Sequence, residues 1–560
     1  MKLSSILVNL FVMILFAVSS CELCAQSYHT DSKKAIKSYE SALQCFYDKN
    51  YDKALSLVDK SLSYDEEFCE ALLLKAELFL EKHDEIQSIN VYEELFSIDS
   101  MAFPRASFAL AKLYVNAHKY DEAASLLEWF LRLKSQKEDY RLYAKEQLDI
   151  ALFRKDLYDN PVTYNPLNIG SVVNTHADEY INQYYPDEDK LIFTKRYHED
   201  KRLTENVFVT MMYDSVWSIP QVLFDKYKDV GAANVSSNGK EIYFSASGWN
   251  IGEGSCDIYS VKFVDGKWIG PINIKVVNSS EWESQPCLSA DGNELYFVRR
   301  NKRLGTSDIY VSHRDSVGNW IKPEKLDSNI NTAGNEMAPF LHYDKQTLYF
   351  ASDTRDGMGG YDLFMSRKDD DDKWSEAINL GYPLNTEADE INIVVAPDAK
   401  SAFISAKKTD GYGGYDIYIF DIDERFRPQF IEVEKQSDKG YYADVLARQE
   451  SVTLKNINFE FDSAELTSDS DNGIEMLVAF LSSNEDVVIE LVGHTDDMGD
   501  ADYNISLSER RAESVRMALV DNGISINRIK IKGCGATQPL FPNDSDKHRA
   551  LNRRVEMKLR

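Results

Sequence analysis

The spacing of hydrophobic and polar positions changes twice along the chain and divides it into three blocks. Residues 30–158 carry apolar side chains at helical spacing, and residues 161–428 alternate apolar and polar positions in short runs. Residues 451–560 contain both patterns in turn. Sustained helical spacing predicts amphipathic helices, and alternation predicts strands. The chain is therefore predicted to be multidomain, with an all-α block, an all-β block and an α/β block, the last preceded by a mostly polar connector at 429–450.

The helical block repeats itself at steps of 34 and 35 residues. Four-residue segments that end in a small residue begin at Tyr51, Glu85 and Tyr120. An apolar run that fits one helix face follows each of them, at 55–62, 89–96 and 126–133. The small residue lets two helices of a hairpin pack closely, and 139–158 fits a final capping helix. This pattern resembles the tetratricopeptide repeat, which implies a domain at 30–158 that binds peptides or partner proteins.

The strand-rich block repeats at steps of 51 to 54 residues. Each unit contains a strand similar to Leu-Tyr-Phe, and these strands lie at 191–193, 242–244, 295–297, 348–350 and 402–404. A second strand follows in each unit, and in four units a Trp opens another strand. Short strands at such a period predict the blades of a propeller. The segments 290–297 and 359–362 resemble the WD40-like repeats of the TolB propeller, which implies a β-propeller at 161–428.

The propeller is predicted to close by pairing the two ends of the block. Its fifth unit ends near Arg427 without a Trp-led strand, whereas 168–175 matches 379–386, which ends the fourth unit. The segment 164–169 is therefore predicted to supply the outer strand of the last blade. This arrangement gives five blades and leaves no long exposed edge. A six-bladed ring with one unrecognised blade is the alternative.

The C-terminal block predicts an α/β sandwich. Its strands are expected at 452–461, 487–493, 528–533 and 554–559, and its helices at 473–481 and 508–521. The sequences that carry a family resemblance are the strand 457–462, then Gly493-His494-Thr495-Asp496, Leu507-Ser508, Arg511-Ala512, Val515, Leu519 and 551–556. With this spacing, 451–560 resembles the OmpA-like peptidoglycan-binding domain shared with the peptidoglycan-associated lipoprotein and the flagellar stator protein MotB.

This resemblance implies non-catalytic binding of peptidoglycan. Family members recognise the free amino-acid end of diaminopimelate, which carries an ammonium and a carboxylate. Asp496 is then expected to take the ammonium, and Arg511, in the first turn of the following helix, to grip the carboxylate with the help of the helix N-terminus. Thr495, Asn504 and Arg553 are implied neighbours of the ligand. A simple ion pair between Asp496 and Arg511 is the alternative.

The N-terminus predicts export. Lys2 precedes an apolar run at 3–18, which is short for a membrane span and typical of a signal peptide. The residues ending at Cys21 resemble a bacterial lipobox, which implies a signal peptide at 1–20 and lipidation of Cys21. The protein would then lie on the periplasmic face of the outer membrane. Cleavage before Gln26 by ordinary signal peptidase is the alternative.

Composition and motifs exclude several function classes. The formal net charge is -29 and there is no Lys/Arg-rich run, which argues against a nucleic-acid partner. The sequence lacks a G-x-S-x-G elbow, an H-E-x-x-H helix and a P-loop, so no enzyme is expected and a propeller-containing envelope hydrolase is a remote alternative. The Gly/Asp-rich turns do not match EF-hand spacing. No metal and no cofactor are expected.

The three blocks together predict a cell-envelope protein that tethers the outer membrane, or a partner complex, to the cell wall. Its expected partners are peptidoglycan, the outer membrane through a lipid anchor, and unidentified envelope proteins. The domain combination resembles Bacteroidota envelope proteins that include a peptidoglycan-binding accessory of type IX secretion, which is the alternative function. Those proteins often carry a carboxypeptidase-regulatory-like domain, for which the 22-residue connector leaves no room.

Overall fold

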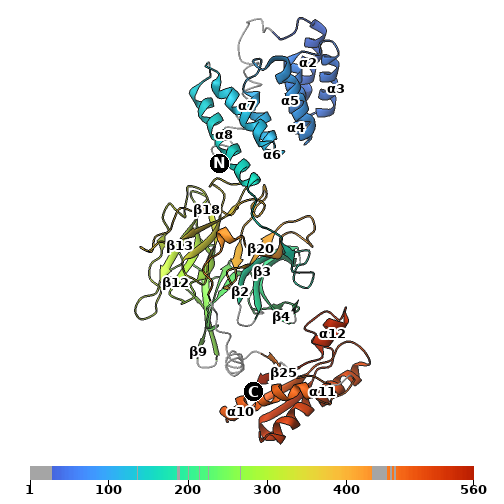
Figure 1. Ribbon diagram of the computed structural model, residues 1–560, viewed down its shortest axis with the longest axis vertical. Helices are drawn as coiled ribbons and strands as arrows, with labels where there is room; N and C mark the ends of the chain where they lie inside the picture. The colour runs from blue at the N-terminus through green and yellow to red at the C-terminus, as the bar shows by residue number, and fades with distance from the viewer. Residues whose placement is uncertain are drawn as a thin grey trace. The chain divides into compact units, whose positions relative to one another are not determined.

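The computed structural model describes residues 28–134, 136–185, 189–199, 201–213, 215–224, 226–264, 267–431, 451–454, 457–459 and 462–560. The chain divides into two compact units, and the boundary between them in the sequence falls between Asp159 and Asn160. Figure 1 shows that the first is helical, while the second contains a strand-rich part and an α/β part. The predicted signal peptide, Cys21 and nearly all of the predicted connector lie outside the described residues.

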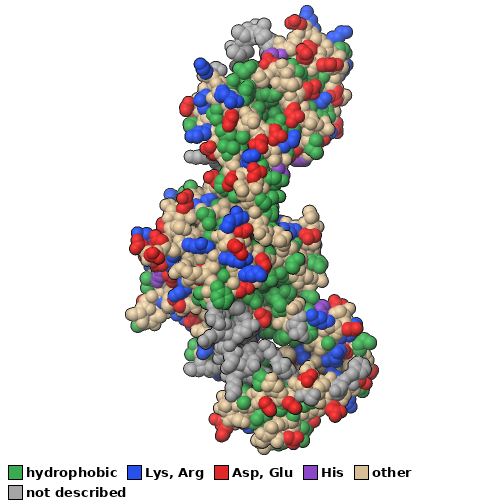
Figure 2. Space-filling model, in the orientation of Figure 1, with side chains coloured by type: hydrophobic (Ala, Val, Ile, Leu, Met, Phe, Trp, Pro, Cys, Tyr) green, Lys and Arg blue, Asp and Glu red, His purple; other side chains and the backbone are tan. Residues whose placement is uncertain are grey.

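Among the described helices, none combines the length and the apolar character needed to cross a membrane. On the face shown in Figure 2, acidic and basic side chains are intermixed over each part. A face of this kind provides no continuous basic stripe along which a phosphate backbone could lie.

The first unit consists of antiparallel helices joined by short turns. Its helices are α2 (Lys33–Tyr47), α3 (Tyr51–Leu62), α4 (Cys69–Glu81), α5 (Glu85–Asp99), α6 (Ala106–Asn116), α7 (Tyr120–Arg132) and α8 (Glu138–Asp159). The turns before α3, α5 and α7 each contain a residue with positive φ: Lys49 (58°), His83 (59°) and His118 (55°). The same backbone turn therefore recurs at the period of the sequence repeat.

The small residues of the repeat lie where paired helices approach each other. Ala54, Ser88 and Ala123 are fully buried. Ser88 also donates its hydroxyl hydrogen bond to the carbonyl of Ala76 on the preceding helix, at 3.0 Å. A larger side chain at these positions would push the helices of a hairpin apart. The predicted apolar runs thus lie on the helices α3, α5 and α7, and only the run at 126–133 extends one residue beyond its helix.

Among the described residues, the strands of the strand-rich part form four hydrogen-bonded sheets. The eight-stranded one divides into two antiparallel groups, which gives five antiparallel sheets in chain order. They are β2 (Asp178–Tyr185), β3 (Lys190–Glu199), β4 (Arg202–Tyr213), β5 (Val216–Trp217) and β6 (Gln221–Val222); β7 (Val230–Val235), β8 (Glu241–Ser247), β9 (Cys256–Val264) and β10 (Lys267–Asn273); β11 (Trp282–Leu288), β12 (Glu294–Asn301), β13 (Thr306–His313) and β14 (Glu324–Lys325); β15 (Glu336–Leu341), β16 (Thr347–Ser352), β17 (Asp362–Arg367) and β18 (Ile378–Asn379); and β19 (Ile393–Val395), β20 (Ser401–Ala406), β21 (Asp416–Asp421) and β1 (Leu167–Asn168). A single parallel pair, Trp282 with Cys256, connects the second and third sheets.

The first strands of the five sheets contact one another in the closed order β2, β7, β11, β15, β19 and back to β2. Hydrogen bonds join neighbouring sheets. Gln183 exchanges two with the backbone of Val235, at 2.8 and 2.9 Å. Asn234 Oδ1 accepts one from Leu288 N–H at 3.0 Å. These bonds satisfy backbone groups that the bulged first strands leave without a ladder partner.

The start of the strand-rich part pairs with its end. Leu167 and Asn168 of β1 pair antiparallel with Ile419 and Tyr418 of β21. Six residues after Asn168, the buried Asn174 accepts the N–H of Ile417 at 2.8 Å and donates to its carbonyl at 2.9 Å. The same pair of hydrogen bonds, from one Asn side chain to the N–H and the carbonyl of one residue, recurs within three other sheets. The pairs are Asn278 with Ile258, Asn331 with Ile309 and Asn385 with Leu363.

A buried glutamate begins the first strand, or the segment leading into it, in four of the five sheets. Glu179, Glu283, Glu336 and Glu390 each accept a hydrogen bond from a Ser or Thr hydroxyl four residues earlier. Glu283 also forms an ion pair with Arg299 at 2.7 Å. Glu390 has no ion pair among the described residues, and its burial raises its pKa to about 8. The two glutamates therefore occupy equivalent positions but differ in their environment, because a cation pairs with Glu283 and none pairs with Glu390 among the described residues.

This difference predicts opposite effects of the same substitution. The folded chain keeps a proton on Glu390 up to about pH 8, whereas the unfolded chain loses it near its ordinary pKa of about 4.3. Stability should therefore fall as pH rises between these values, because the unfolded state binds fewer protons there.

Glu390→Gln should raise the melting temperature at pH 8 and flatten its pH dependence. Glu283→Gln should lower it by about 3 °C or more, because Arg299 loses its anion. Calorimetry from pH 5 to about 9 covers the predicted window, and equal shifts of the two variants would contradict this assignment.

The α/β part packs two helices against a mixed sheet. The sheet order is β22 (Val452–Thr453), β25 (Val555–Leu559), β23 (Ile489–Gly493), β24 (Ile529–Gly533), and only β23 and β24 are parallel. The helices are α10 (Asp471–Ser483), α11 (Ala501–Asp521) and the short α12 (Asp546–Asn552). Apolar side chains of α10, α11 and the sheet form one core.

Two predictions for this part are wrong. The predicted strand 452–461 is a strand only at Val452–Thr453 among the described residues, and Phe459 forms an isolated bridge with Leu466. The predicted helix at 508–521 begins seven residues earlier, at Ala501, because the side chain of Asp500 caps it by accepting two backbone N–H groups. The helix α12 was not expected, and Ser545 caps it in the same way.

Candidate functional site

The candidate site lies where α11 crosses the ends of β23 and β24. Gly493 and Gly533 pair in register at these strand ends. A Cβ at Gly493 would lie 1.9 Å from the carbonyl oxygen of Ser508, and one at Gly533 would lie 2.5 Å from that of Ile505. Only glycine therefore allows the helix backbone to approach so closely. This close packing sets α11 beside the loop that leaves β23 and carries Asp496.

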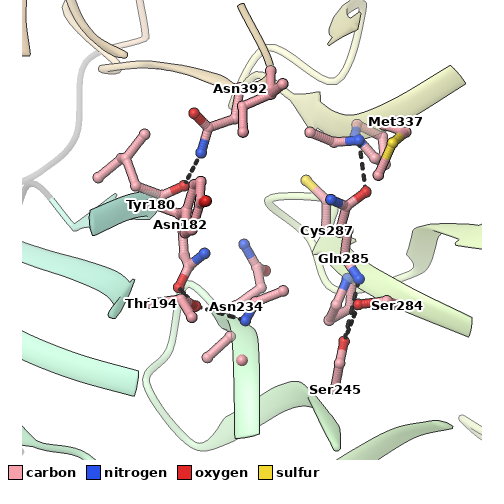
Figure 3. Close-up of a pocket in the computed structure, with 18 of the residues that line it drawn as sticks. Tyr180, Asn182, Thr194, Asn234, Ser245, Ser284, Gln285, Cys287, Met337 and Asn392 are labelled. Atoms are coloured by element: carbon pink, nitrogen blue, oxygen red, sulfur yellow. Dashed lines mark hydrogen bonds between the residues drawn. The ribbon is translucent and has the colours of Figure 1, made fainter. Parts of the chain in front are cut away.

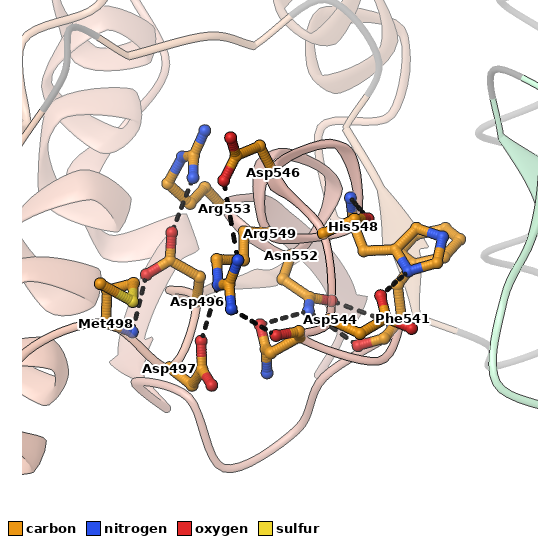
Figure 4. A network of polar contacts seen from close by, with 12 residues as sticks. Asp496, Asp497, Met498, Phe541, Asp544, Asp546, His548, Arg549, Asn552 and Arg553 are labelled. Atoms are coloured by element: carbon orange, nitrogen blue, oxygen red, sulfur yellow. Dashed lines mark hydrogen bonds and ion pairs between the residues drawn. The ribbon is translucent and has the colours of Figure 1, made fainter.

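Asp496 is held in this loop by two contacts. Its side chain is largely buried, and Oδ1 accepts the N–H of Met498 at 3.1 Å. Its Oδ2 forms an ion pair with Arg553 Nη1 at 2.6 Å, as Figure 4 shows. Arg553 follows α12, and about a third of its side chain is exposed. Asp496 is thus a carboxylate fixed in position by an arginine 57 residues away in the sequence.

A second ion pair fixes the next residue of the loop. Asp497 pairs with Arg549 of α12 at 3.2 Å, and Arg549 also donates to the carbonyl of Asn543 at 2.7 Å. Figure 4 shows that the two arginines approach the loop from the α12 segment. Because α12 supplies Arg549 and immediately precedes Arg553, this short helix is what brings both cations to the loop.

Asn504 and Thr495 are buried around the same loop. Asn504 donates from Nδ2 to the carbonyls of Met498 at 3.0 Å and Asp496 at 3.4 Å, so it shapes the loop. Thr495 donates its N–H to the carbonyl of Gly535 at 3.0 Å. Its hydroxyl is buried and has no hydrogen-bond partner among the described residues. Asn504 therefore has a structural role here, while the Thr495 hydroxyl keeps its bonding capacity.

Arg511 is almost completely buried, at 2% exposure. Its Nε donates to the carbonyl of Ser463 at 3.0 Å, and its guanidinium lies 5.2 Å from the ring centroid of Phe459. Its Nη1 is buried with no hydrogen-bond partner, and no acidic side chain pairs with it within the described part of the chain. A buried guanidinium without an anion is costly, so this group is available for an anionic ligand.

The charges around Arg511 have opposing effects on its pKa. Burial is the largest influence and lowers the pKa, and the nearby positive charge of Arg553 lowers it further. Asp496 and Asp462 act in the opposite direction. A bound carboxylate would counter the first two effects, because it favours the charged guanidinium.

The structure corrects two details of the expected site. Arg511 lies ten residues after the start of α11 at Ala501, so the helix N-terminus does not assist it. Asp496 pairs with Arg553 and not with Arg511, so the alternative of a simple Asp496–Arg511 ion pair is also wrong within the described residues. The first correction follows from the earlier start of α11, which moves Arg511 beyond the first turn of the helix.

The remaining polar residue of the strand end has a structural position. His494 is buried, burial lowers its pKa, and its Nε2 lies 3.6 Å from Glu556. Glu556 in turn accepts from Arg554 Nε at 2.9 Å. Both ring nitrogens of His494 are buried and have no hydrogen-bond partner among the described residues.

Three contributions to the site were not expected from the sequence. Ser463 and Met498 act through backbone groups, which leave no residue-type signal. Phe459 lies within the strand motif at 457–462, so the motif contained it, but its contact with Arg511 was not inferred. The arrangement as a whole presents one fixed carboxylate and two guanidinium groups. It can hold a ligand that carries an ammonium and a carboxylate close together.

Comparisons with known proteins identify a family and several relatives to which part of this chain is similar. A sequence model described as the OmpA family matches residues 458–553. Outer membrane porin F of Pseudomonas fluorescens is 36% identical over 101 residues, covering 18% of this chain and 31% of that protein. The peptidoglycan-associated lipoprotein of Pseudomonas aeruginosa is also 36% identical over 101 residues, covering 18% of this chain and 59% of that protein.

A solved structure shows a similar match. The crystal structure of the peptidoglycan-associated lipoprotein from Burkholderia pseudomallei is 27% identical, covers 19% of this chain and 88% of that chain, and has a TM-score of 0.18. The chain spans less than two thirds of the length of the curated relatives named above. The range matched by the family model lies within the C-terminal α/β part, which is OmpA-like.

Proposed function

We propose that this OmpA-like domain binds peptidoglycan without catalysis and tethers the rest of the protein to the cell wall. The observation that carries the proposal is the buried Arg511, whose Nη1 has no partner among the described residues. It lies close enough to Asp496 and Arg553 to respond to their charges. The relatives that match this domain include a peptidoglycan-associated lipoprotein and an outer membrane porin.

The proposed ligand is the free amino-acid end of diaminopimelate in the wall peptide. Its carboxylate would accept hydrogen bonds from Arg511, whose planar fork suits that geometry. Its ammonium would donate to Asp496, because each carboxylate oxygen has a second lone pair beyond its present contact. The Thr495 hydroxyl, buried without a partner among the described residues, would be a further contact.

The other two blocks are proposed to be interaction modules. The recurring positive-φ turns and buried small residues support a tetratricopeptide array at 30–158. The closed order of the first strands and the pairing of β1 with β21 support a five-bladed propeller at 161–428. Both modules would hold a partner protein at the wall. A peptidoglycan-anchored accessory of type IX secretion is the second candidate function, supported by the domain combination.

The proposed membrane attachment is a lipid on Cys21. The apolar run at 3–18 and the lipobox-like residues before Cys21 support it, and it would place the protein on the periplasmic face of the outer membrane. Cells fed an alkyne fatty acid should label the wild type and leave Cys21→Ala unlabelled. An unlabelled wild type that begins at Gln26 would show ordinary processing instead.

The proposed ligand is tested by sedimentation with purified cell walls. The protein should pellet with diaminopimelate-type peptidoglycan and at least about tenfold less with lysine-type peptidoglycan, which lacks the side-chain carboxylate. Asp496→Asn should weaken the first interaction, because the neutral amide cannot pair with an ammonium and leaves Arg553 without its anion. Equal pelleting with both wall types would refute diaminopimelate as the recognised group.

A further inference from the structure

We propose that the cavity enclosed by the first strands of the five sheets is a second binding site, for a small uncharged ligand that presents two or more amide carbonyl groups. The cavity has a volume of about 420 Å³, which falls in the range of ligand pockets. It lies in the strand-rich part, and no residue of the candidate wall-binding site lines it. The inference is therefore independent of peptidoglycan binding.

Three amide side chains of the lining supply unused hydrogen-bond donors. Asn182, Asn234 and Gln285 come from β2, β7 and β11. Figure 3 shows their side chains around the open space at the centre of the cavity. None of their amide nitrogens donates a hydrogen bond to another described residue, and Asn234 is 5% exposed.

The orientation of each amide is fixed by the partner of its oxygen. Asn234 Oδ1 accepts the N–H of Leu288 at 3.0 Å, and Gln285 Oε1 accepts that of Ala338 at 2.8 Å. Asn182 Oδ1 accepts the Thr194 hydroxyl at 2.8 Å. The same hydroxyl oxygen accepts the N–H of Ala232 at 2.8 Å. Each oxygen is thus held by the scaffold, and each NH2 group remains for a ligand.

The backbone presents these residues through repeated bulges. The pairing of β2, β7, β11 and β15 with its neighbour shifts register at the cavity. Ala232, Gln285 and Ala338 lie at these bulges with φ of 47°, 56° and 49°, a conformation that costs energy for residues other than glycine. Bulges redirect side chains and occur beside binding sites. Strained conformations of this kind accumulate at functional sites.

The charges of the lining select against an anionic ligand. Glu205 and Asp229 line the cavity, and Arg196, the cation among the lining residues, already pairs with Asp178 at 2.8 Å. Burial raises the pKa of Glu205, so its charge would be disfavoured further by a second anion. Apolar groups such as Met337 and Phe340 complete the wall. Unpaired donors beside apolar surface suit a neutral ligand with carbonyl acceptors.

Amide carbonyls of this kind occur in two sources, an acetamido sugar and a peptide backbone. Two uncharged probes with two amide carbonyl groups each separate them: N,N′-diacetylchitobiose and N-acetylalanine methylamide. Titration calorimetry of the whole protein should show binding of at least one probe, and the probe that binds identifies the source. Absence of heat with both probes at up to about 10 mM, which already corresponds to weak binding, would overturn the proposal.

Isosteric variants make the assignment specific. Asn234→Asp and Gln285→Glu keep the oxygen that accepts the backbone N–H and replace the free NH2 by a second acceptor. Each variant should weaken probe binding about tenfold or more. The control is Gln346→Glu, which makes the same charge change at an exposed position. The melting temperatures of the two cavity variants should be close to that of this control. Sedimentation with cell walls should be unchanged in all three. Probe binding equal to wild type in both cavity variants would refute the site.

Discussion

Arg511→Met should abolish sedimentation with diaminopimelate-type peptidoglycan without destabilising the C-terminal domain. In the unliganded protein this guanidinium is buried, its Nη1 has no partner and no ion pair neutralises it among the described residues. Removing the guanidinium relieves an uncompensated buried charge, which offsets the loss of its hydrogen bond to the Ser463 carbonyl. The domain should therefore melt close to the wild-type temperature, although it no longer binds.

The expected loss of binding is large, because the carboxylate of the bound ligand would still be buried but would no longer be paired with the Arg511 guanidinium. Removing one partner of a desolvated charge pair costs about 2–5 kcal/mol, and about 1.4 kcal/mol corresponds to tenfold in affinity. The lower end of this range gives a loss of roughly 30-fold. Arg511→Lys should bind nearly as poorly, because an ammonium cannot reproduce the bidentate fork.

Arg510→Met is the matched control for this experiment. Arg510 is the preceding residue of α11, carries the same charge, and is exposed beside the ring of Tyr503. It should pellet like the wild type. Sedimentation and thermal unfolding must be measured on the same samples. If Arg511→Met pellets like wild type, Arg511 does not bind the wall, and if it fails only by unfolding, the guanidinium has a structural role.

The sequence predicts the elements of this protein better than the contacts between them. Internal repeats provide a template, so the likeness of 168–175 to 379–386 was enough to pair β1 with β21. The ion pair between Asp496 and Arg553 has no such template. This ion pair depends on α12, a seven-residue helix that the hydrophobic spacing does not predict. The helix places Arg553 beside Asp496, which lies 57 residues earlier in the sequence.

The candidate site shows the same limit at shorter range. The motif placed Asp496 and Arg511 in one site, but not the start of α11. That start depends on the cap at Asp500, while the apolar spacing becomes regular only near Leu507. A helix boundary set by one side-chain hydrogen bond is among the least predictable features of a sequence. That Arg511 Nη1 has no hydrogen-bond partner among the described residues is likewise a tertiary property, which the sequence pattern does not reveal.

Asn174→Ala should destabilise the strand-rich part by about 1–3 kcal/mol, because it leaves the buried N–H of Ile417 without a partner. It also removes one of the two hydrogen bonds to the Ile417 carbonyl, which still accepts the N–H of Ile169 at 3.3 Å. The two bonds of Asn174, at 2.8 and 2.9 Å, connect residues 243 apart and hold the first segment of this part to its last sheet. Asn278 makes the same pair of bonds to Ile258, at 2.8 Å each, across only 20 residues. Asn278→Ala is therefore the control, because it removes the same two hydrogen bonds between residues that are close in the sequence.

The comparison of these two variants tests whether pairing of the chain ends is part of the cooperative fold. If β1 belongs to that fold, the two variants should lower the melting temperature by similar amounts, and the Ile417 amide should exchange at the global unfolding rate in the wild type. If β1 were a frayed end, Asn174→Ala would cost less than about 0.5 kcal/mol, as for an ordinary surface change, while Asn278→Ala would retain its full effect. A large cost in Asn278→Ala alone would therefore contradict closure through the chain ends.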